Sequence, residues 1–469
     1  MITSLLKYAP IQVFSALSVF VLIAIQTRFL TLKSYGVLAV VLVVLELVRA
    51  FSTQWINTSM LRLYPSCSVQ EQEQLVQSIS LMVMIGSLLG FAAITITLFI
   101  YQQLSWELSL VLCALLFVKS LFQYQLEFSR LNDRLIVYRQ AIFLQSVSAV
   151  IFSLLLLSLS ATMESALFAL TTSYGVGAFV LGFPSQPKWH SGMLTRLFSY
   201  GLPIMVAGGV SVLGGRIDRL FIAHFSGMNE TGIYAAQANL LMGVMSLVFM
   251  VISVPLYPNL AKCTEDRPTL LRQHQTYLDL LLTLTFPALL GLGFLQEEII
   301  MLLLGEQYLI NSQALFWVLA LAVYLINFKA HYLDHGLQFL LQTGKLLWIS
   351  VIGLGLSLLL LPIMLPQYGV VGAALTLLIV SSLVALLSFI SSLCAGYRYS
   401  IGSDGIKALI SALVMWFYLY EIKMLPLTIN PLLTLGFYIF SSVALYGLSL
   451  LLLNAFGIRQ RLFDLWRLN

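Results

Sequence analysis

Among the charged residues inside apolar stretches of this sequence, where a charge is costly, five are candidates for a functional site. Glu46 and Arg49 are three residues apart, so on a helix they share a face and can form an ion pair. Arg216, Asp218 and Arg219 lie together in a later apolar stretch that is long enough to cross a bilayer. A charge at the centre of a membrane helix costs about 2.5–3.5 kcal/mol on insertion scales. We therefore expect these side chains to face a water-filled cleft rather than lipid.

The residue types in these stretches are suited to binding an anion. A guanidinium group presents a planar fork of donors that matches phosphate oxygens. We expect Arg49, Arg216 and Arg219 to line a cationic cleft, with Glu46 and Asp218 as counter-charges or proton carriers. The alternative is that these residues form structural ion pairs between helices, or extend from helix ends toward water.

Two prolines are candidate hinges in the helices that would line such a cleft. Pro10 and Pro203 lie near the start of two apolar segments. A proline inside a membrane helix frees a carbonyl group and bends the helix. The alternative is a proline tolerated in the first turn of its helix.

Signatures of metal binding and of enzyme chemistry are missing from the sequence. His331 and His335 have a spacing compatible with one metal, but no HExxH motif and no third ligand accompany them, so an interface pair is expected. The four cysteines form no CxxC pair, and neither GxxxxGK[ST] nor GxSxG occurs. We expect no metal, no cofactor and no enzyme activity. Any transport against a concentration gradient must then be driven by an ion gradient, by the membrane potential or by downstream consumption of the transported substrate.

The composition identifies the class of protein. Hydrophobic residues make up 60% of the 469 residues and charged residues 9%, whereas a soluble domain carries about 25% charged residues. Apolar segments of about 20 residues recur along the chain, which predicts an all-α polytopic membrane protein with about fourteen transmembrane helices. These segments are 9–30, 36–58, 77–101, 107–128, 138–160, 163–184, 198–224, 232–257, 277–296, 312–333, 346–366, 369–396, 405–422 and 429–454.

The distribution of basic residues predicts the orientation of the chain. Most Lys and Arg residues outside the segments fall on the same side as the N-terminus, whereas Arg28, Lys33 and Lys423 fall on the other side. The positive-inside rule therefore places both termini in the cytoplasm.

A weak internal repeat predicts the domain organisation. Pro10 and Pro65 are separated by the same distance as Pro203 and Pro258, and each of these prolines follows a nearby tyrosine. An even number of segments separates the two copies, so the copies have the same orientation and form a parallel repeat. We expect two six-helix lobes followed by two extra helices and a cytoplasmic tail, at residues 1–192, 193–398 and 399–469.

The stretch from Gly214 to Leu241 carries a family resemblance. It resembles a signature of polysaccharide-exporting flippases, in which an Asp is followed by an aliphatic run, a Gly turn and Gly-x-Tyr at the start of the next helix. Tyr35-Gly36 is similar, and the resemblance covers most of residues 1–396. It is moderately specific for the MATE-like multidrug/oligosaccharidyl-lipid/polysaccharide exporter superfamily. The matching positions are Asp218, Gly227, Gly232 and Tyr234.

Within this superfamily the resemblance implies a Wzx-type O-antigen flippase of the bacterial inner membrane. Such a protein moves an oligosaccharide linked to undecaprenyl pyrophosphate from the cytoplasmic to the periplasmic face by alternating access. Its expected partners are the lipid-linked oligosaccharide, membrane lipids, a coupling ion (H⁺ or Na⁺) and polysaccharide polymerase machinery, with no nucleic acid.

Three alternatives predict different features. A lipid II flippase has a similar cationic cavity and is the nearest alternative. A multidrug or ion antiporter for organic cations needs a cavity dominated by acids, which the excess of basic residues at depth argues against. A membrane glycosyltransferase or O-antigen polymerase should show a long charged periplasmic loop, and the sequence has no long loop between its apolar segments.

Overall fold

A computed structural model describes residues 2–100, 106–182, 185–310, 312–424, 430–457 and 459, and these residues form helices with no strand among them. Thirteen of the described helical stretches are long and apolar enough to cross a membrane. One of them, Thr343–Cys394, is interrupted at Gly369, where φ is 57° and ψ is −143°. Counting it as two helices recovers the predicted segments 346–366 and 369–396 and the predicted number of spans. The all-α polytopic class is confirmed.

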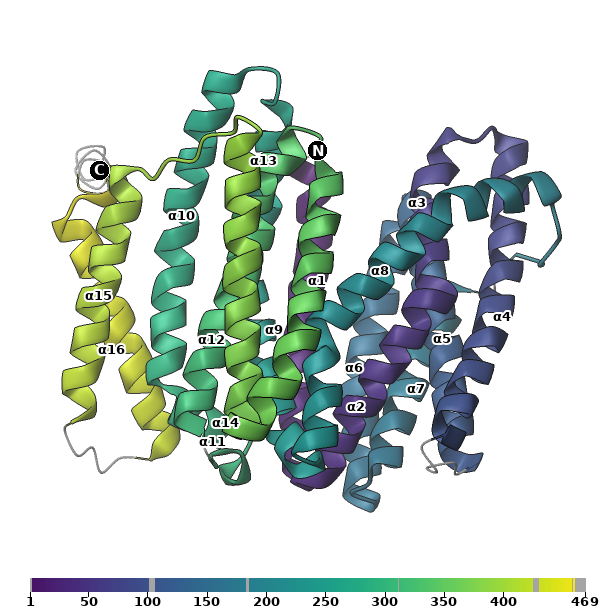
Figure 1. Cartoon of the computed structure of the whole chain (residues 1–469), viewed down its shortest axis with the longest axis horizontal. Coiled ribbons are helices and arrows are strands. Elements are labelled where there is room, and N and C mark those ends of the chain that lie inside the picture. The colour runs from purple at the N-terminus through teal and green to yellow at the C-terminus, as the bar shows by residue number, and fades with distance from the viewer. Residues whose placement is uncertain are drawn as a thin grey trace. The chain divides into compact units, whose positions relative to one another are not determined.

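The chain divides into two compact units, of which unit 1 comprises residues 1–235 and 354–373. In this unit α6 packs along α7 and α1, and α8 crosses α2 and α3 (Figure 1). Its helices are α1 (Ile2–Phe29), α2 (Leu32–Arg49), α3 (Trp55–Leu63), α4 (Val69–Ile100), α5 (Trp106–Leu131), α6 (Leu135–Leu159), α7 (Met163–Leu181), α8 (Ser191–Phe225), the start of α9 (Met228–Lys262) and the middle of α14 (Thr343–Cys394).

Unit 2 comprises residues 236–353 and 374–469. The predicted segment 405–422 is a helix, α15, which packs against α10 and α16 and buries Ala408, Ala412 and Leu419 completely. The helices of this unit are the rest of α9, α10 (Arg267–Phe294), α11 (Gln296–Leu303), α12 (Ser312–Phe328), α13 (Asp334–Phe339), parts of α14 (Thr343–Cys394), α15 (Ser403–Lys423) and α16 (Pro431–Leu452).

The units group the helices by packing, whereas the predicted lobes group them by the repeat. Helix α8, which we expect to open the second lobe, packs within unit 1 on α2, α3 and α4. The lobe boundaries at 192 and 398 therefore stay a prediction.

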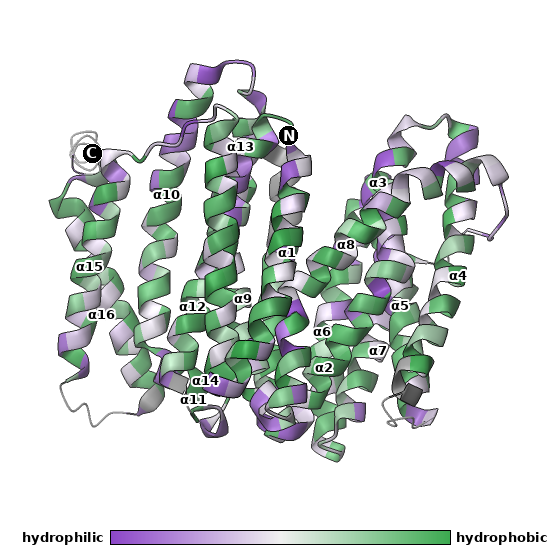
Figure 2. Cartoon of the chain, in the orientation of Figure 1, coloured by the Kyte–Doolittle hydropathy of each residue, from purple (hydrophilic) through white to green (hydrophobic). Residues whose placement is uncertain are grey.

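Several helices extend beyond the apolar segments from which they are predicted. Helix α1 begins at Ile2 and α8 begins at Ser191, before the starts of the predicted apolar segments 9–30 and 198–224. Hydropathy marks the part of a helix that crosses lipid, and polar turns continue the same helix beyond it (Figure 2). Pro10 and Pro203 consequently lie inside helices rather than in a first turn, and α8 changes direction along its length (Figure 1).

Two π-helical turns interrupt regular helices, one inside the predicted segment 36–58 and one at the end of the predicted segment 312–333. The turn η1 (Ala50–Gln54) lies between α2 and α3, and η4 (Lys329–Leu333) lies between α12 and α13. A π-turn has bonds from residue i to residue i+5, widens the helix and is frequent at functional sites.

Two glycines allow a close helix contact in unit 1 between α2 and the start of α9. A Cβ atom at Gly36 would lie 2.9 Å from the backbone nitrogen of Gly232 and would overlap the carbonyl oxygen of Met228. At Gly232 it would overlap the carbonyl oxygen of Leu32. Small residues allow such close contact between membrane helices, where packing rather than water exclusion stabilises association.

Replacing Gly36 by Ala should therefore destabilise the protein by about 1–3 kcal/mol, because the added methyl group has no room. Gly447→Ala on α16 is the matched control, since a Cβ atom there would meet nothing within 4 Å. Thermal unfolding of the two purified variants would measure the difference. Equal melting temperatures would contradict the close contact.

Candidate functional site

The centre of the candidate site is the carboxylate of Glu46 on α2. Its Oε2 atom accepts hydrogen bonds from Arg49 Nε at 3.0 Å and from Arg49 Nη2 at 2.7 Å. Its Oε1 atom accepts a hydrogen bond from Lys119 Nζ on α5. The three side chains are largely buried within unit 1. One carboxylate is thus shared between two cations, and this cluster keeps a net positive charge.

Polar and aromatic groups complete the surroundings of the two cations. Arg49 Nη1 donates to Gln123 Oε1 at 2.6 Å, and Arg49 Nη2 donates to Gln54 Oε1 at 3.4 Å. The Lys119 ammonium lies 5.3 Å from the ring centroid of Tyr174 on α7, a cation–π distance. Each of the three guanidinium nitrogens of Arg49 therefore has an acceptor, as a buried charge requires.

The π-turn η1 explains how Gln54 reaches Arg49. The turn begins directly after Arg49, and its i to i+5 geometry brings residues five apart close together. Thr53, also in the turn, is fully buried, and its hydroxyl lies 2.8 Å from the hydroxyl of Ser120 on α5. The turn thereby fixes α2 against α5, next to Lys119.

Helix α8 brings the predicted arginines toward this cluster. A Cβ atom at Gly209 would overlap the ring of Phe51 in η1, and one at Gly201 would overlap the ring of Trp55 on α3. This close approach places Arg216 where it interacts electrostatically with Glu46 and Arg49. The structure thus gathers two arginines that are far apart in the sequence.

The part of α8 just before Arg216 faces open space. A Cβ atom at Gly208, Gly214 or Gly215 would meet nothing within 4 Å, and the Arg216 side chain is exposed. Arg216 is therefore accessible to a molecule beside the helix. Arg49, by contrast, is only 6% exposed.

Asp218 and Arg219 occupy different environments. Asp218 is buried, and its Oδ2 atom accepts a hydrogen bond from the hydroxyl of Tyr234 on α9, while its Oδ1 atom accepts one from the Arg219 backbone N–H at 2.8 Å. The side chain of Arg219 is half-buried and interacts electrostatically with Arg216 and Tyr234. Asp218 therefore joins α8 to α9 as well as balancing charge.

The cluster also contains residues outside the set chosen from the sequence. Lys119 interrupts the apolar segment 107–128 just as Arg49 interrupts its own segment, and Gln123 follows one turn later. This interruption of an apolar segment could have identified Lys119 as a candidate from the sequence. Nothing in the sequence indicates that Tyr174 lies beneath it, because the contact depends on how α7 packs against α5.

The ionisable residues of unit 2 are arranged differently. Lys329 pairs with Asp334 at 2.8 Å, and Ser388 donates to the same carboxyl group at 2.7 Å. His335 lies among aromatic rings, including His274 with a centroid separation of 5.6 Å. The described residues contain no group of three or more His, Cys, Asp or Glu residues that could hold a metal ion.

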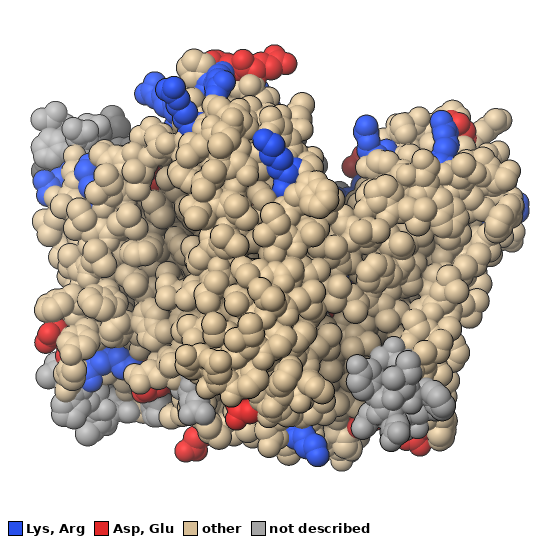
Figure 3. Space-filling model, viewed as in Figure 1, with Lys and Arg blue, Asp and Glu red and all other residues tan. Residues whose placement is uncertain are grey.

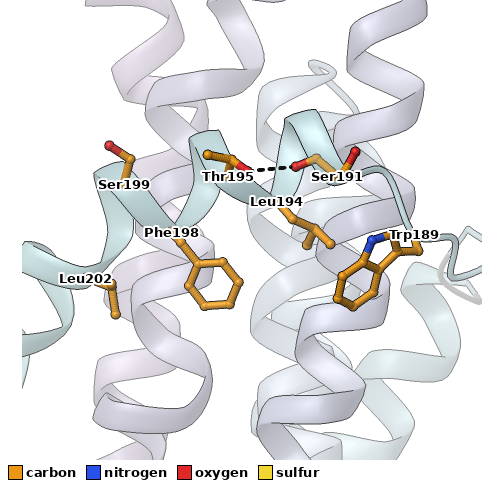
Figure 4. A pocket seen from close by; sticks show the side chains of 7 residues that line it. All are labelled: Trp189, Ser191, Leu194, Thr195, Phe198, Ser199 and Leu202. Atoms are coloured by element: carbon orange, nitrogen blue, oxygen red, sulfur yellow. Dashed lines mark hydrogen bonds between the residues drawn. The ribbon is translucent and has the colours of Figure 1, made fainter.

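An open cavity of about 430 Å³ lies along the first turns of α8 and contains none of these charged residues. Leu194, Phe198 and Leu202 point to the same side of the helix, together with Trp189 (Figure 4). The Thr195 hydroxyl donates to the Ser191 carbonyl oxygen at 3.0 Å, so it offers no free donor to a ligand. The cavity is apolar, and it is distinct from the cationic cluster.

Comparisons with proteins of known structure identify the fold. A lipid II flippase MurJ in an inward closed conformation aligns with a TM-score of 0.72, covering 97% of this chain and 99% of that chain at 16% identity. An inward-facing multidrug resistance MATE family transporter of the MOP superfamily aligns with a TM-score of 0.59, covering 80% and 93% at 13% identity. The predicted MATE-like fold is confirmed.

Sequence comparisons identify the family. The "Lsg locus putative protein 1" of Haemophilus influenzae is 26% identical over 124 residues, a match that spans 26% of this chain and 30% of that relative's length. Residues 25–313, more than half of the chain, match the family described as "Polysaccharide biosynthesis protein". The resemblance carried by Gly214–Leu241 is confirmed at this level, and the chain belongs to the polysaccharide biosynthesis protein family.

Proposed function

We propose that this protein is a flippase for oligosaccharide repeat units linked to undecaprenyl pyrophosphate, of the Wzx O-antigen type. It would move them from the cytoplasmic to the periplasmic face of a bacterial inner membrane. The observation that carries the proposal is the cationic cluster of unit 1. Four cations, Arg49, Lys119, Arg216 and Arg219, are gathered with only two carboxylates, Glu46 and Asp218.

The chemistry of the cluster suits a pyrophosphate. Guanidinium groups bind phosphate oxygens through two parallel hydrogen bonds, and a lysine adds a compact point charge. Arg216 is the exposed member, so it would contact the phosphate first, while the Glu46 carboxylate holds Arg49 and Lys119 beneath it. The lipid tail would remain in the bilayer while the sugar crosses.

Alternating access would require the predicted lobes 1–192 and 193–398 to rock against each other. Pro10 and Pro203 lie inside α1 and α8, where the missing backbone donor of a proline weakens the helix. We assign them as hinges. A coupling ion, H⁺ or Na⁺, would drive the cycle, and polysaccharide polymerase machinery would consume the product, so the protein transports its substrate rather than transforming it.

Two alternatives make different demands on this cluster. A lipid II flippase would use the same cations for the same pyrophosphate, so the sugar is what separates it from an O-antigen flippase. A multidrug antiporter would have to bind organic cations, and a cluster in which basic residues outnumber acids would repel them.

Deleting the protein in its own bacterium should cause its lipid-linked substrate to accumulate on the cytoplasmic face. Extraction and mass spectrometry of undecaprenyl-linked glycans would identify the substrate. Accumulated O-antigen or polysaccharide units would support the proposal. Accumulated lipid II would favour the lipid II alternative, and unchanged glycans would contradict both.

Arg216→Ala and Arg219→Ala should abolish surface polysaccharide while the protein remains in the membrane. Each loss of a charge-assisted hydrogen bond costs about 1.5–3 kcal/mol, or about tenfold to a hundredfold in binding. Arg130→Ala is the matched control, because Arg130 is an exposed arginine of the same unit that pairs with Glu127 at 3.5 Å. If both α8 variants complement a deletion fully, the cationic cluster does not bind the substrate.

Glu46→Gln should destabilise the protein by about 3–5 kcal/mol, because it leaves two buried cations without their carboxylate. Adding Lys119→Met should restore part of that stability by removing one of the two cations. Thermal unfolding of the single and double variants would complete a double-mutant cycle. Strictly additive effects would show that Glu46 and Lys119 are not coupled.

A further inference from the structure

A second basic site lies in unit 2, remote in sequence from the cationic cluster. An open cavity of about 510 Å³ is formed between the start of α10 and the end of α14. One arginine of the lining lies at the start of α10 and the other lies in the segment just after α14, and a leucine from each helix adjoins them. Its lining residues are Arg267, Leu271, Leu393, Gly396, Tyr397 and Arg398.

The backbone on one side of this cavity is fixed by the end of α14. Gly396 has a φ of 87°, a conformation that favours glycine, and its N–H donates to the Leu393 carbonyl oxygen at 2.8 Å. The next N–H, of Tyr397, donates to the Ser392 carbonyl oxygen at 2.9 Å. This is the Schellman pattern that ends a helix, and it sets the position from which Arg398 extends.

The Tyr397 side chain anchors the same segment in the protein. It is 2% exposed, and a 2.9 Å hydrogen bond joins its hydroxyl to Nδ1 of His274 on α10. Burial raises the pKa of the Tyr397 phenol, so this group stays neutral. The wall of the cavity is therefore held in place before any ligand binds.

The two arginines keep most of their donors available. Arg267 Nη2 donates to the Gly396 carbonyl oxygen, which uses one of its five N–H groups. Neither Arg267 nor Arg398 forms an ion pair with a carboxylate among the described residues, whereas Lys407 on α15 pairs with Asp404 at 3.1 Å. Both guanidinium groups are exposed.

Acidic residues lie next to the cavity in the sequence but do not line it. Glu265 and Asp266 precede Arg267 and are exposed, and basic side chains stand beside acidic ones near the upper end of α10 (Figure 3). The Asp266 carboxylate accepts the Thr269 N–H at 3.4 Å and caps the helix. The cavity itself has arginines and no acid in its lining.

The lining suits a ligand with an anionic head and an apolar body. Two guanidinium groups can bind the oxygens of one phosphate, and Leu271 and Leu393 offer apolar surface beside it. The cavity lies at the end of the helices that the distribution of positive charge predicts to be cytoplasmic. Basic pockets between membrane helices on that side bind the head groups of anionic lipids.

We propose that the cavity formed by Arg267, Arg398 and the end of α14 binds the phosphate of an anionic phospholipid. This site is separate from the proposed substrate cluster and does not depend on which glycan the protein carries. The bound lipid would tie α10 to the end of α14.

The test uses the full chain, purified with a mixture of phosphatidylglycerol and phosphatidylethanolamine, and counts the retained lipids by native mass spectrometry. The wild-type protein should retain phosphatidylglycerol preferentially. The double variant Arg267→Gln/Arg398→Gln should retain about tenfold less, because it removes the charge-assisted bonds to the phosphate. Arg272→Gln is the matched control, since Arg272 is exposed on the same helix but does not line the cavity.

Arg398→Gln alone provides a second measurement if the double variant fails to fold, because no hydrogen bond of the Arg398 side chain supports the described structure. Its loss of phosphatidylglycerol should exceed that of Arg272→Gln. Three results would overturn the proposal: equal retention of the two lipids, equal losses in Arg398→Gln and Arg272→Gln, or displacement of all retained phosphatidylglycerol by inorganic phosphate.

Discussion

The cost of a charge in a medium without water governs the arrangement of unit 1. The Glu46 carboxylate offsets that cost because one of its oxygens pairs with Arg49 and the other with Lys119, and these two cations lie on different helices. A buried pair of this kind adds little net stability, but removing one partner is expensive. The shared carboxylate therefore fixes α2 against α5, and Gln123, Gln54 and the ring beneath Lys119 complete a polar core inside an otherwise apolar bundle.

The absence of water around the helices also explains why glycines lie at the contacts of α8 and α9. Between membrane helices the surrounding lipid is as apolar as leucine, so close packing replaces the exclusion of water as the stabilising force. Gly209 and Gly201 allow α8 to pack against Phe51 and Trp55, and this approach determines how near Arg216 lies to the cluster. The apolar helix contacts thus set the electrostatics of the proposed substrate site.

Several features of the site could be predicted from the sequence because they depend on neighbours along one helix. Glu46 and Arg49 share a face at a spacing of three, and the structure pairs them at 2.7 Å. The positions of Pro10 and Pro203 within their helices could not be predicted, since hydropathy does not mark where a helix starts. The π-turn after Arg49 also escapes prediction, because no residue type or spacing is specific for it.

The sequence by itself determined the class of protein, the number of spans, the family and the presence of costly charges at depth. Composition and segment length decide these features, since each depends on local hydropathy or on a contiguous motif. Only the tertiary structure decided that Lys119 joins Glu46, that Asp218 binds Tyr234, and that Arg216 lies near Arg49. Those contacts join residues on different helices, and the packing of side chains at the helix crossings selects among the many pairings that an apolar pattern allows.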